Sequence, residues 1–294
     1  MKENLGIQPS KCPQCNKLAK EDVPFCERCN FDLRYGVLDR GKASKCIHCK
    51  KREILSDEHI FPDWLSKKYP RRNKRTSHRL NRPSHHRFGE KPKIYSVASV
   101  RQGDPYITKV SNVCKSCNNG WMSDLQNQAK GMIECLAEGE WPNLIEGDCN
   151  ILSRWVAMVS INFQCYARIL NATVHQRETL MSGSMPSGWR VSIGSMKTTE
   201  SAGHSFHRSI QVPFQIKEDE FLRIDSTYFC IEHVAFHALS SICDQLLDLG
   251  MKYGVGNFSL PTREVWPFNS CADQSAGCGL TGDDLVAIQR QLDS

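Results

Sequence analysis

The hydrophobic positions along the chain change their period from one segment to the next. Over 94–113 apolar residues alternate loosely with polar ones, which favours strands, and 52–62 indicates a strand that ends at a proline turn. From 120 to about 137 apolar residues recur on one face, which predicts a helix. A second helix is expected over 152–170, with Ser153 as its N-cap.

The C-terminal half reads as short strands separated by turns. Strands are predicted at 189–194 and 209–216, and a closing helix over 282–292. The apolar stretch 228–239 fits a helix or strands equally well. No apolar run is much longer than about 10 residues, too few to span a bilayer, and the first residues carry no apolar signal region. We therefore expect an α+β protein located in the cytoplasm.

Charge divides the chain into two parts. With 294 residues, of which 40% are hydrophobic, it can bury a core and form two or three domains. Residues 1–130 hold 27 Lys and Arg against 13 Asp and Glu, a net charge of +14. The remainder holds 11 against 19, a net charge of −8, which together give the overall +6. A basic N-terminal part indicates a polyanionic partner.

Cysteine spacing adds metal sites to this picture. Of the 15 cysteines, eight fall in four Cys-x-x-Cys pairs within the first 117 residues, and an intracellular chain usually uses such pairs for metal. The first two pairs predict a zinc ribbon, because each pair presents two thiolates to one tetrahedral ion. A redox dithiol is the alternative use. The expected ligands are Cys12, Cys15, Cys26 and Cys29.

The second two pairs bracket a group of residues suited to phosphodiester hydrolysis. An acid–histidine pair, Glu58 and His59, lies between them, and Asn118 follows the last cysteine directly. These side chains would supply a general base and two oxygen ligands for a catalytic cation. Asp57 is the alternative to Glu58 as ligand, because adjacent strand residues face opposite ways. A second structural zinc is expected at Cys46, Cys49, Cys114 and Cys117.

Residues 67–93 form the most basic segment, with 11 basic residues against the single acid Glu90. Almost nothing in it can be buried, so we expect a flexible loop. Its charges are predicted to contact phosphates, and a merely solvated insertion is the alternative. The candidate nucleic-acid-binding residues are Lys67, Lys68, Arg71, Arg72, Lys74, Arg75, Arg79, Arg82 and Arg87.

The run Cys-x-x-Cys-Asn-Asn-Gly-Trp-Met-Ser, preceded by Glu-His-Ile-Phe-Pro-x-Trp-Leu, resembles bacterial HNH endonucleases, the zinc-bound branch of the ββα-metal nucleases. The resemblance implies a domain in which zinc joins two strands to one helix. His59 would be the general base, and Glu58 and Asn118 would hold catalytic Mg²⁺ or Mn²⁺. Lys109 stands where the family usually has its middle asparagine, and Asn112 is the nearest substitute.

We expect three parts: 1–40, zinc ribbon and linker; 41–140, an HNH nuclease domain containing the basic loop; and 141–294, a C-terminal α+β domain of unknown role. The favoured function is cleavage of DNA, with RNA left open, and the resemblance implies bacterial antiviral defence or a mobile element. The alternatives are a catalytically inactive, zinc-dependent nucleic-acid-binding regulator, and a module that binds a protein partner through the ribbon or the C-terminal domain.

Overall fold

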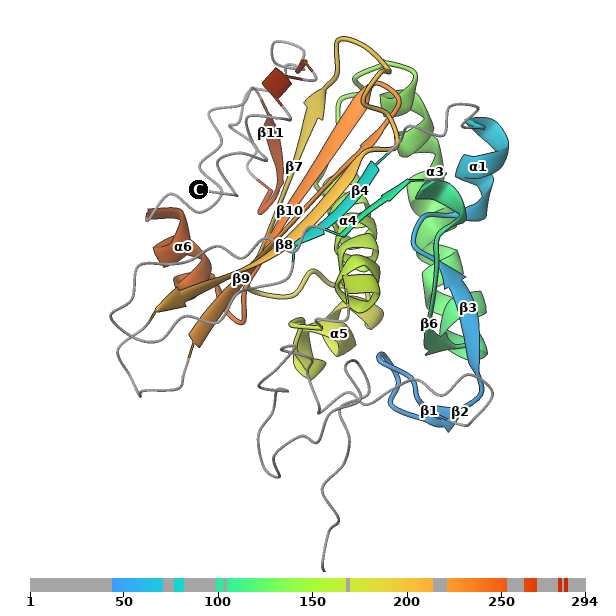
Figure 1. The fold of residues 1–294 in the computed structure, drawn as a ribbon, viewed down its shortest axis with the longest axis vertical. Helices are drawn as coiled ribbons and strands as arrows, with labels where there is room; N and C mark the ends of the chain where they lie inside the picture. Colours follow the sequence, from blue (N-terminus) through green and yellow to red (C-terminus); the bar gives the residue numbers. More distant parts are fainter. Residues whose placement is uncertain are drawn as a thin grey trace, which may run out of the picture.

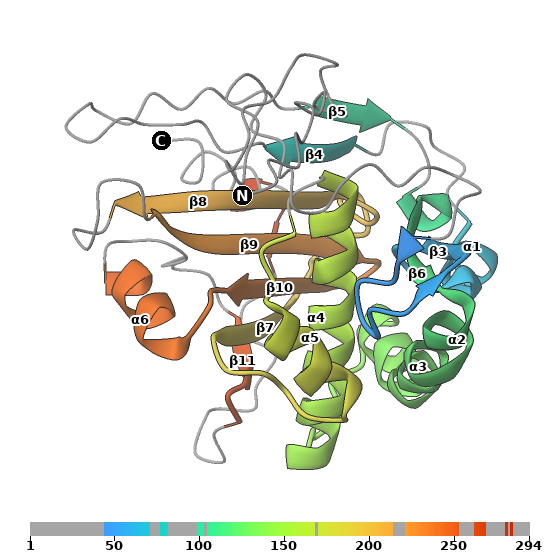
Figure 2. The same ribbon diagram turned by 90° about the horizontal axis from the view of Figure 1, so that it is seen from below.

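The fold is seen in a computed structural model (Figures 1 and 2). It describes residues 44–70, 77–81, 99–102, 105–167, 170–213, 221–252, 262–268, 280–281 and 283–284. The expected zinc ribbon with Cys12, Cys15, Cys26 and Cys29, and nearly all of the expected closing helix over 282–292, lie outside the described residues. Both stay predictions.

Two small antiparallel strand pairs begin the described chain. β1 (Ser44–Lys45) pairs with β2 (Arg52–Glu53), and β3 (Leu55–His59) pairs with β6 (Lys109–Cys114). The second pair makes neighbours of segments more than 50 positions apart in the sequence. Three short helical elements accompany the strands: α1 (Asp63–Lys68), the 3-10 turn η2 (Pro105–Ile107) and α2 (Lys115–Cys117).

The helix predicted over 120–137 is confirmed as α3 (Ser123–Ala137). It continues from a π-helical turn, η3 (Asn118–Met122), in which Gly120 has φ −97° and ψ −118° and so bends the chain between α2 and α3. The apolar face that predicted the helix is buried, chiefly through Leu125, Ile133 and Leu136.

α4 (Glu146–Ala167) is the longest helix among the described residues, and it is buried along nearly its whole length. It begins at Glu146 rather than at 152, so Ser153 lies buried inside it and the prediction of Ser153 as N-cap is wrong. Asp148 stabilises the N-terminus of α4 instead, because its carboxylate accepts a hydrogen bond from the backbone N–H of Ile145 at 3.2 Å. The sheet covers one side of α4 and α3 covers another (Figure 2), which explains why its polar residues are buried too.

A seven-stranded sheet forms the centre of the molecule. Only one neighbouring pair, β4 with β8, is parallel, and the others are antiparallel. The predicted strand at 189–194 is confirmed as β7; of the one predicted at 209–216, residues 209–213 belong to β8 and 214–216 lie outside the described residues. In order across the sheet, the strands are β11 (Arg263–Trp266), β7 (Trp189–Ser195), β10 (Val234–Ser240), β9 (Phe221–Ile231), β8 (Ser205–Pro213), β4 (Ser77–Asn81) and β5 (Ser99–Gln102).

The ambiguous stretch 228–239 is a β-hairpin made from the end of β9 and most of β10. Glu232 sits in its two-residue turn with a positive φ of 46°, a value that tight hairpin turns require. Burial on both faces explains the continuous apolar run: Phe229 and Phe236 face α4, while Tyr228 and Cys230 belong to a second apolar cluster.

Part of the basic segment 67–93 is also sheet. Residues 77–81 form β4, which pairs with both β5 and β8, so the expectation of a flexible loop is wrong for this stretch. The hydrogen bonds of a strand from elsewhere in the chain order these residues, although the sequence offers little to bury. Residues 71–76 and 82–98 lie outside the described part of the chain.

Residues on both sides of position 140 form one hydrophobic core. Phe61 lies just after β3, yet its ring packs edge-on against Phe163 of α4 and Phe229 of β9, with centroids 5.6 and 5.2 Å apart. Trp155 and Phe236 extend the same aromatic cluster. Residues on both sides of the proposed boundary at 140 thus share one apolar cluster, and the domain boundaries themselves stay a prediction.

Two further helices complete the described fold. α5 (Val174–Met181) follows α4 on the same side of the sheet. α6 (Asp244–Lys252) lies at the end of the sheet away from β3 and β6 (Figure 2). Among the described residues no helix combines the length and apolar character needed to cross a membrane.

Candidate functional site

The four cysteines predicted to share one zinc ion come together. Cys46 and Cys49 lie in the turn that joins β1 to β2, Cys114 ends β6 and Cys117 ends α2. Their Sγ atoms all lie within 4.8 Å of one another, and those of Cys49 and Cys114 are 3.6 Å apart. Tetrahedral zinc with bonds of about 2.3 Å sets sulfur atoms about 3.8 Å apart, so the cluster could hold a metal such as zinc.

Burial shields most of this cluster from solvent. Cys46, Cys114 and Cys117 are buried and Cys49 is partly exposed. Burial raises the pKa of the Cys114 thiol to about 11 and also raises the pKa of Cys117. Burial acts the same way on Cys46, but hydrogen bonds from backbone groups outweigh it and lower that pKa. A metal ion would replace the thiol protons, as zinc does in closed structural sites.

Glu58 is a buried carboxyl beside this cluster. It lies on β3 opposite Val110, next to a β-bulge in the pairing with β6, and only 5% of its surface is exposed. Burial raises its pKa from 4.5 to about 7, although Gln126 of α3 lowers it somewhat by donating to Oε1 at 3.3 Å. A carboxyl that titrates near neutrality is a frequent mark of a functional site.

Asn118 lies on the same side of β3 as Glu58. Its Nδ2 donates to Oγ of Ser56 at 3.2 Å, and Ser56 precedes Glu58 by two positions, so the two share a strand face. Within the described part of the chain, the Oδ1 atom of Asn118 accepts no hydrogen bond. The four-cysteine cluster causes this arrangement, because Asn118 follows Cys117 directly while β3 pairs with Cys114.

His59 lies on the opposite face of β3. It is half-buried and faces Lys109 in the strand register. Burial lowers its pKa and so does Lys109, while Asp63 and Asp57 act in the opposite direction. The imidazole is therefore neutral at pH 7, the form that a general base requires.

Asp57, the alternative ligand, alternates onto the His59 face of β3. It is exposed and accepts a hydrogen bond from Ser111 of β6. The structure thus divides the three consecutive polar residues as strand geometry dictates: Asp57 and His59 on the outer face, Glu58 toward α3.

Asn112 is joined to the first cysteine turn. Its backbone carbonyl accepts from the N–H of Ile47 at 3.1 Å, and its side chain acts on Cys165 of α4, whose pKa burial raises and Asn112 lowers. These contacts tie β6 to the turn and to α4. A role for Asn112 in catalysis stays a prediction.

The predicted phosphate contacts are described only in part. Lys67 pairs with Asp63 within α1 at 2.5 Å, and Lys68 reaches Glu138 and Glu134 of α3 at 2.7 and 3.4 Å. Arg79 lies in β4. The other candidates lie outside the described residues: Arg71, Arg72, Lys74, Arg75, Arg82 and Arg87.

Sequence reasoning missed two residues that contact the proposed site, Ser56 and Gln126. Strand periodicity could have indicated Ser56, which shares a face with Glu58 because side chains of a strand repeat every two residues. No local pattern indicates Gln126, because the chain bends at Gly120 between Asn118 and α3 and so interrupts the helical periodicity.

Comparison of the chain with protein-family models, curated proteins and solved structures finds no match.

Proposed function

We propose that this protein is a metal-dependent endonuclease of the HNH type that hydrolyses phosphodiester bonds in DNA. One observation carries the proposal: the four-cysteine cluster joins the β1–β2 turn to the β6–α2 junction, and β3 pairs with β6, so that Glu58 and Asn118 lie on one side of the strand that also carries His59. These are the residue types that such a reaction needs.

Each side chain has a distinct proposed role. His59, neutral at pH 7, would accept the proton of the attacking water. Glu58 and Asn118 would bind Mg²⁺ or Mn²⁺ through oxygen atoms, and the cation would offset the charge that develops on the phosphate. Oxygen atoms remain for such an ion. Gln126 donates to only one carboxylate oxygen of Glu58, and Asn118 uses its side-chain nitrogen, not its oxygen, toward Ser56.

Nicking of supercoiled plasmid in Mg²⁺ or Mn²⁺ tests this function. His59→Ala should lower the rate by about 10²–10⁴ without loss of zinc or folding, because a general base is removed. Glu58→Gln should also be impaired, and higher Mg²⁺ should restore part of its activity. Asp57→Asn is the matched control on the outer face. If Asp57→Asn is inactive and Glu58→Gln is not, the ligand is Asp57. Equal nicking by wild type and His59→Ala would exclude the HNH mechanism.

A specific observation favours a second candidate, a nucleic-acid-binding regulator without catalysis. Glu58 and His59 face opposite sides of β3, and Lys109 lies opposite His59 where the HNH family usually has asparagine. Under this proposal the wild type binds DNA but does not nick it with any divalent ion, and Lys109→Asn is the first variant to test for recovered cleavage.

Both candidates place DNA affinity in the basic segment 67–93. Neutralising Arg71, Arg72, Lys74 and Arg75 together should weaken binding irrespective of sequence. The slope of log K against log salt should flatten by up to about 4, near 0.9 per lost phosphate contact. A gel-shift titration at several salt concentrations measures this, and an unchanged slope would mean that these charges are merely solvated.

The proposed cofactors include two structural zinc ions, one in the described cluster and one at Cys12, Cys15, Cys26 and Cys29. Metal analysis after washing with a weak chelator should find two zinc ions per chain. Cys12→Ser should reduce this number to one and leave the described cluster loaded.

A further inference from the structure

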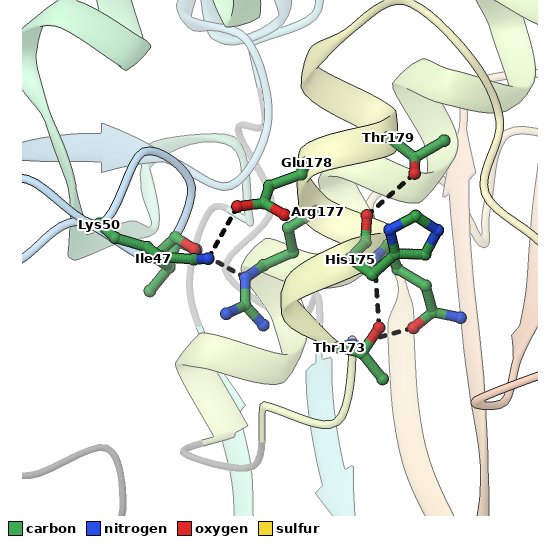
Figure 3. Close-up of polar contacts among 8 residues, drawn as sticks. Ile47, Lys50, Thr173, His175, Arg177, Glu178 and Thr179 are labelled. Atoms are coloured by element: carbon green, nitrogen blue, oxygen red, sulfur yellow. Dashed lines mark hydrogen bonds and ion pairs between the residues drawn. The ribbon is translucent and has the colours of Figure 1, made fainter.

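The backbone of the first cysteine turn is held from two sides at Ile47, the residue between Cys46 and His48. The N–H of Ile47 donates to the carbonyl of Asn112 on β6 at 3.1 Å. Its carbonyl accepts from Nε of Arg177 on α5 at 2.7 Å (Figure 3). A residue 130 positions away in the sequence thus contacts the turn that carries two of the four cysteines.

Arg177 is fixed by its own helix. Thr173 is the N-cap of α5; its side chain accepts from the N–H of Gln176 at 3.1 Å, while the Gln176 side chain accepts from the N–H of Thr173 at 2.9 Å. This reciprocal capping orders the first turn of α5 and hence the position of Arg177. A second contact to the cysteine turn, Lys50 with Glu178 at 2.7 Å, is about half exposed (Figure 3).

The guanidinium of Arg177 is buried without a carboxylate hydrogen-bond partner in the described part of the chain. The residue is 3% exposed, and its hydrogen bonds go to the neutral carbonyls of Ile47 and Ala172. The ion pairs found among described residues involve other cations. A buried charge is unfavourable unless an opposite charge lies close to it. Glu178, the next residue, interacts electrostatically with Arg177, but it is about half exposed and pairs with Lys50, so a buried negative charge beside the guanidinium would stabilise it further.

Four thiolates around one Zn²⁺ carry a formal net charge of −2. Arg177 lies next to this centre, because the carbonyl that accepts from its Nε at 2.7 Å belongs to Ile47, the residue that follows Cys46.

We propose that Arg177 is the counter-charge of the metal–thiolate centre, so that metal binding and docking of α5 onto the first cysteine turn stabilise each other. Arg177 is in this sense a positioning residue for the metal site. The inference rests on metal binding by the four-cysteine cluster and is independent of phosphodiester hydrolysis.

Zinc affinity of the full-length protein, measured by competition with a chromophoric chelator, tests the proposal. Arg177→Lys and Arg177→Gln can both donate to the carbonyl of Ile47, but only lysine keeps the charge. Arg177→Gln should weaken zinc binding by about 10–100-fold, the usual effect of losing a residue that supports metal ligands. Arg177→Lys should retain most of the affinity. Lys50→Met is the matched control, because it removes an exposed pair from the same contact and should change affinity little.

Equal affinities for Arg177→Gln and Arg177→Lys would overturn the counter-charge proposal and leave only a hydrogen bond. A wild type that binds no zinc would overturn it together with the metal centre, whatever the result of the nicking assay.

Hydrogen exchange on the wild type covers the case in which Arg177→Gln does not fold. Removing zinc should strip protection from the backbone amides of α5, because the buried guanidinium loses its counter-charge. The amides of α6 serve as the internal reference, because α6 lies on the opposite side of the molecule from α2, the helix that ends at Cys117 (Figure 2). Unchanged protection of α5 in the zinc-free protein would contradict the proposal.

Discussion

At the scale of the residue, burial decides the properties of the Asp57–Glu58–His59 run. The three side chains are consecutive in sequence, yet strand alternation sends Glu58 inward and its neighbours outward. Glu58 loses water and its pKa rises to about 7, whereas half-buried His59 has a lowered pKa. The two pKa values therefore shift in opposite directions, that of Glu58 upward and that of His59 downward.

The raised pKa of Glu58 makes stability depend on pH in the absence of divalent cations. Its pKa is 4.5 in the unfolded chain and about 7 when folded, so the stabilisation is full below 4.5 and is lost as pH rises through 7. The loss is at most on the order of 3 kcal/mol. Urea unfolding between pH 5 and 8 should show this slope in the wild type and a flatter one in Glu58→Gln. Parallel slopes would show that Glu58 is solvated.

Lys109 should keep the His59 imidazole neutral. Lys109→Gln should raise the pKa of His59, because a cation opposite the ring disfavours its protonation. Lys67→Gln is the comparison: Lys67 acts on His59 more weakly and is already paired with Asp63. NMR titration of the His59 ring protons measures both. An equal shift in the two variants would mean that Lys109 does not face the ring.

At the scale of the element, the residue before β7 and the residue after β10 lie in close backbone contact. Gly188 precedes β7 with φ +76°, and a Cβ there would collide with the carbonyl oxygen of Ser241 just after β10. The N–H of Ser241 in turn donates to the carbonyl of Gly188 at 2.8 Å. Only glycine permits both the positive φ and this contact.

Gly188→Ala should therefore destabilise the protein by roughly 2–4 kcal/mol, the sum of a left-handed backbone cost and a steric clash. Gly183→Ala provides the control, because Gly183 has φ +101° but a methyl group added there would meet nothing within 4 Å. Gly183→Ala should lose only the stability that corresponds to the left-handed backbone cost. Urea midpoints of the two variants give the difference, and equal losses would show that the Ser241 contact relaxes freely.

At the scale of the whole molecule, one core links the cysteine cluster to the central sheet. Phe61 contacts aromatic rings of α4 and β9, and Arg177 joins α5 to the first cysteine turn. A change at the four-cysteine cluster should therefore also affect the stability of the residues after 140.

Cys117→Ser should destabilise the described parts on both sides of residue 140 together, because zinc binding energy is folding energy in such sites. We expect one shared unfolding transition at lower temperature, seen alike by tryptophan fluorescence and by far-ultraviolet circular dichroism. Cys12→Ser should leave that transition in place. Two separate transitions in Cys117→Ser would indicate independent domains.

The sequence by itself determined the local features of this protein. The spacing of Cys46, Cys49, Cys114 and Cys117 predicted their cluster, because each short turn can present two thiolates to one ion. Helical periodicity located α3, and alternation within a strand already implied that Glu58 and Asp57 face opposite ways.

Tertiary structure alone decided what long-range pairing controls. It placed 77–81 in a sheet, because the strand β8 that orders it lies far along the chain. It resolved 228–239 as a hairpin, since burial on both faces removes the alternation that marks strands. It moved the start of α4 away from Ser153 and brought Arg177 to Ile47. Such contacts depend on how whole elements pack, and no local pattern of residues encodes them.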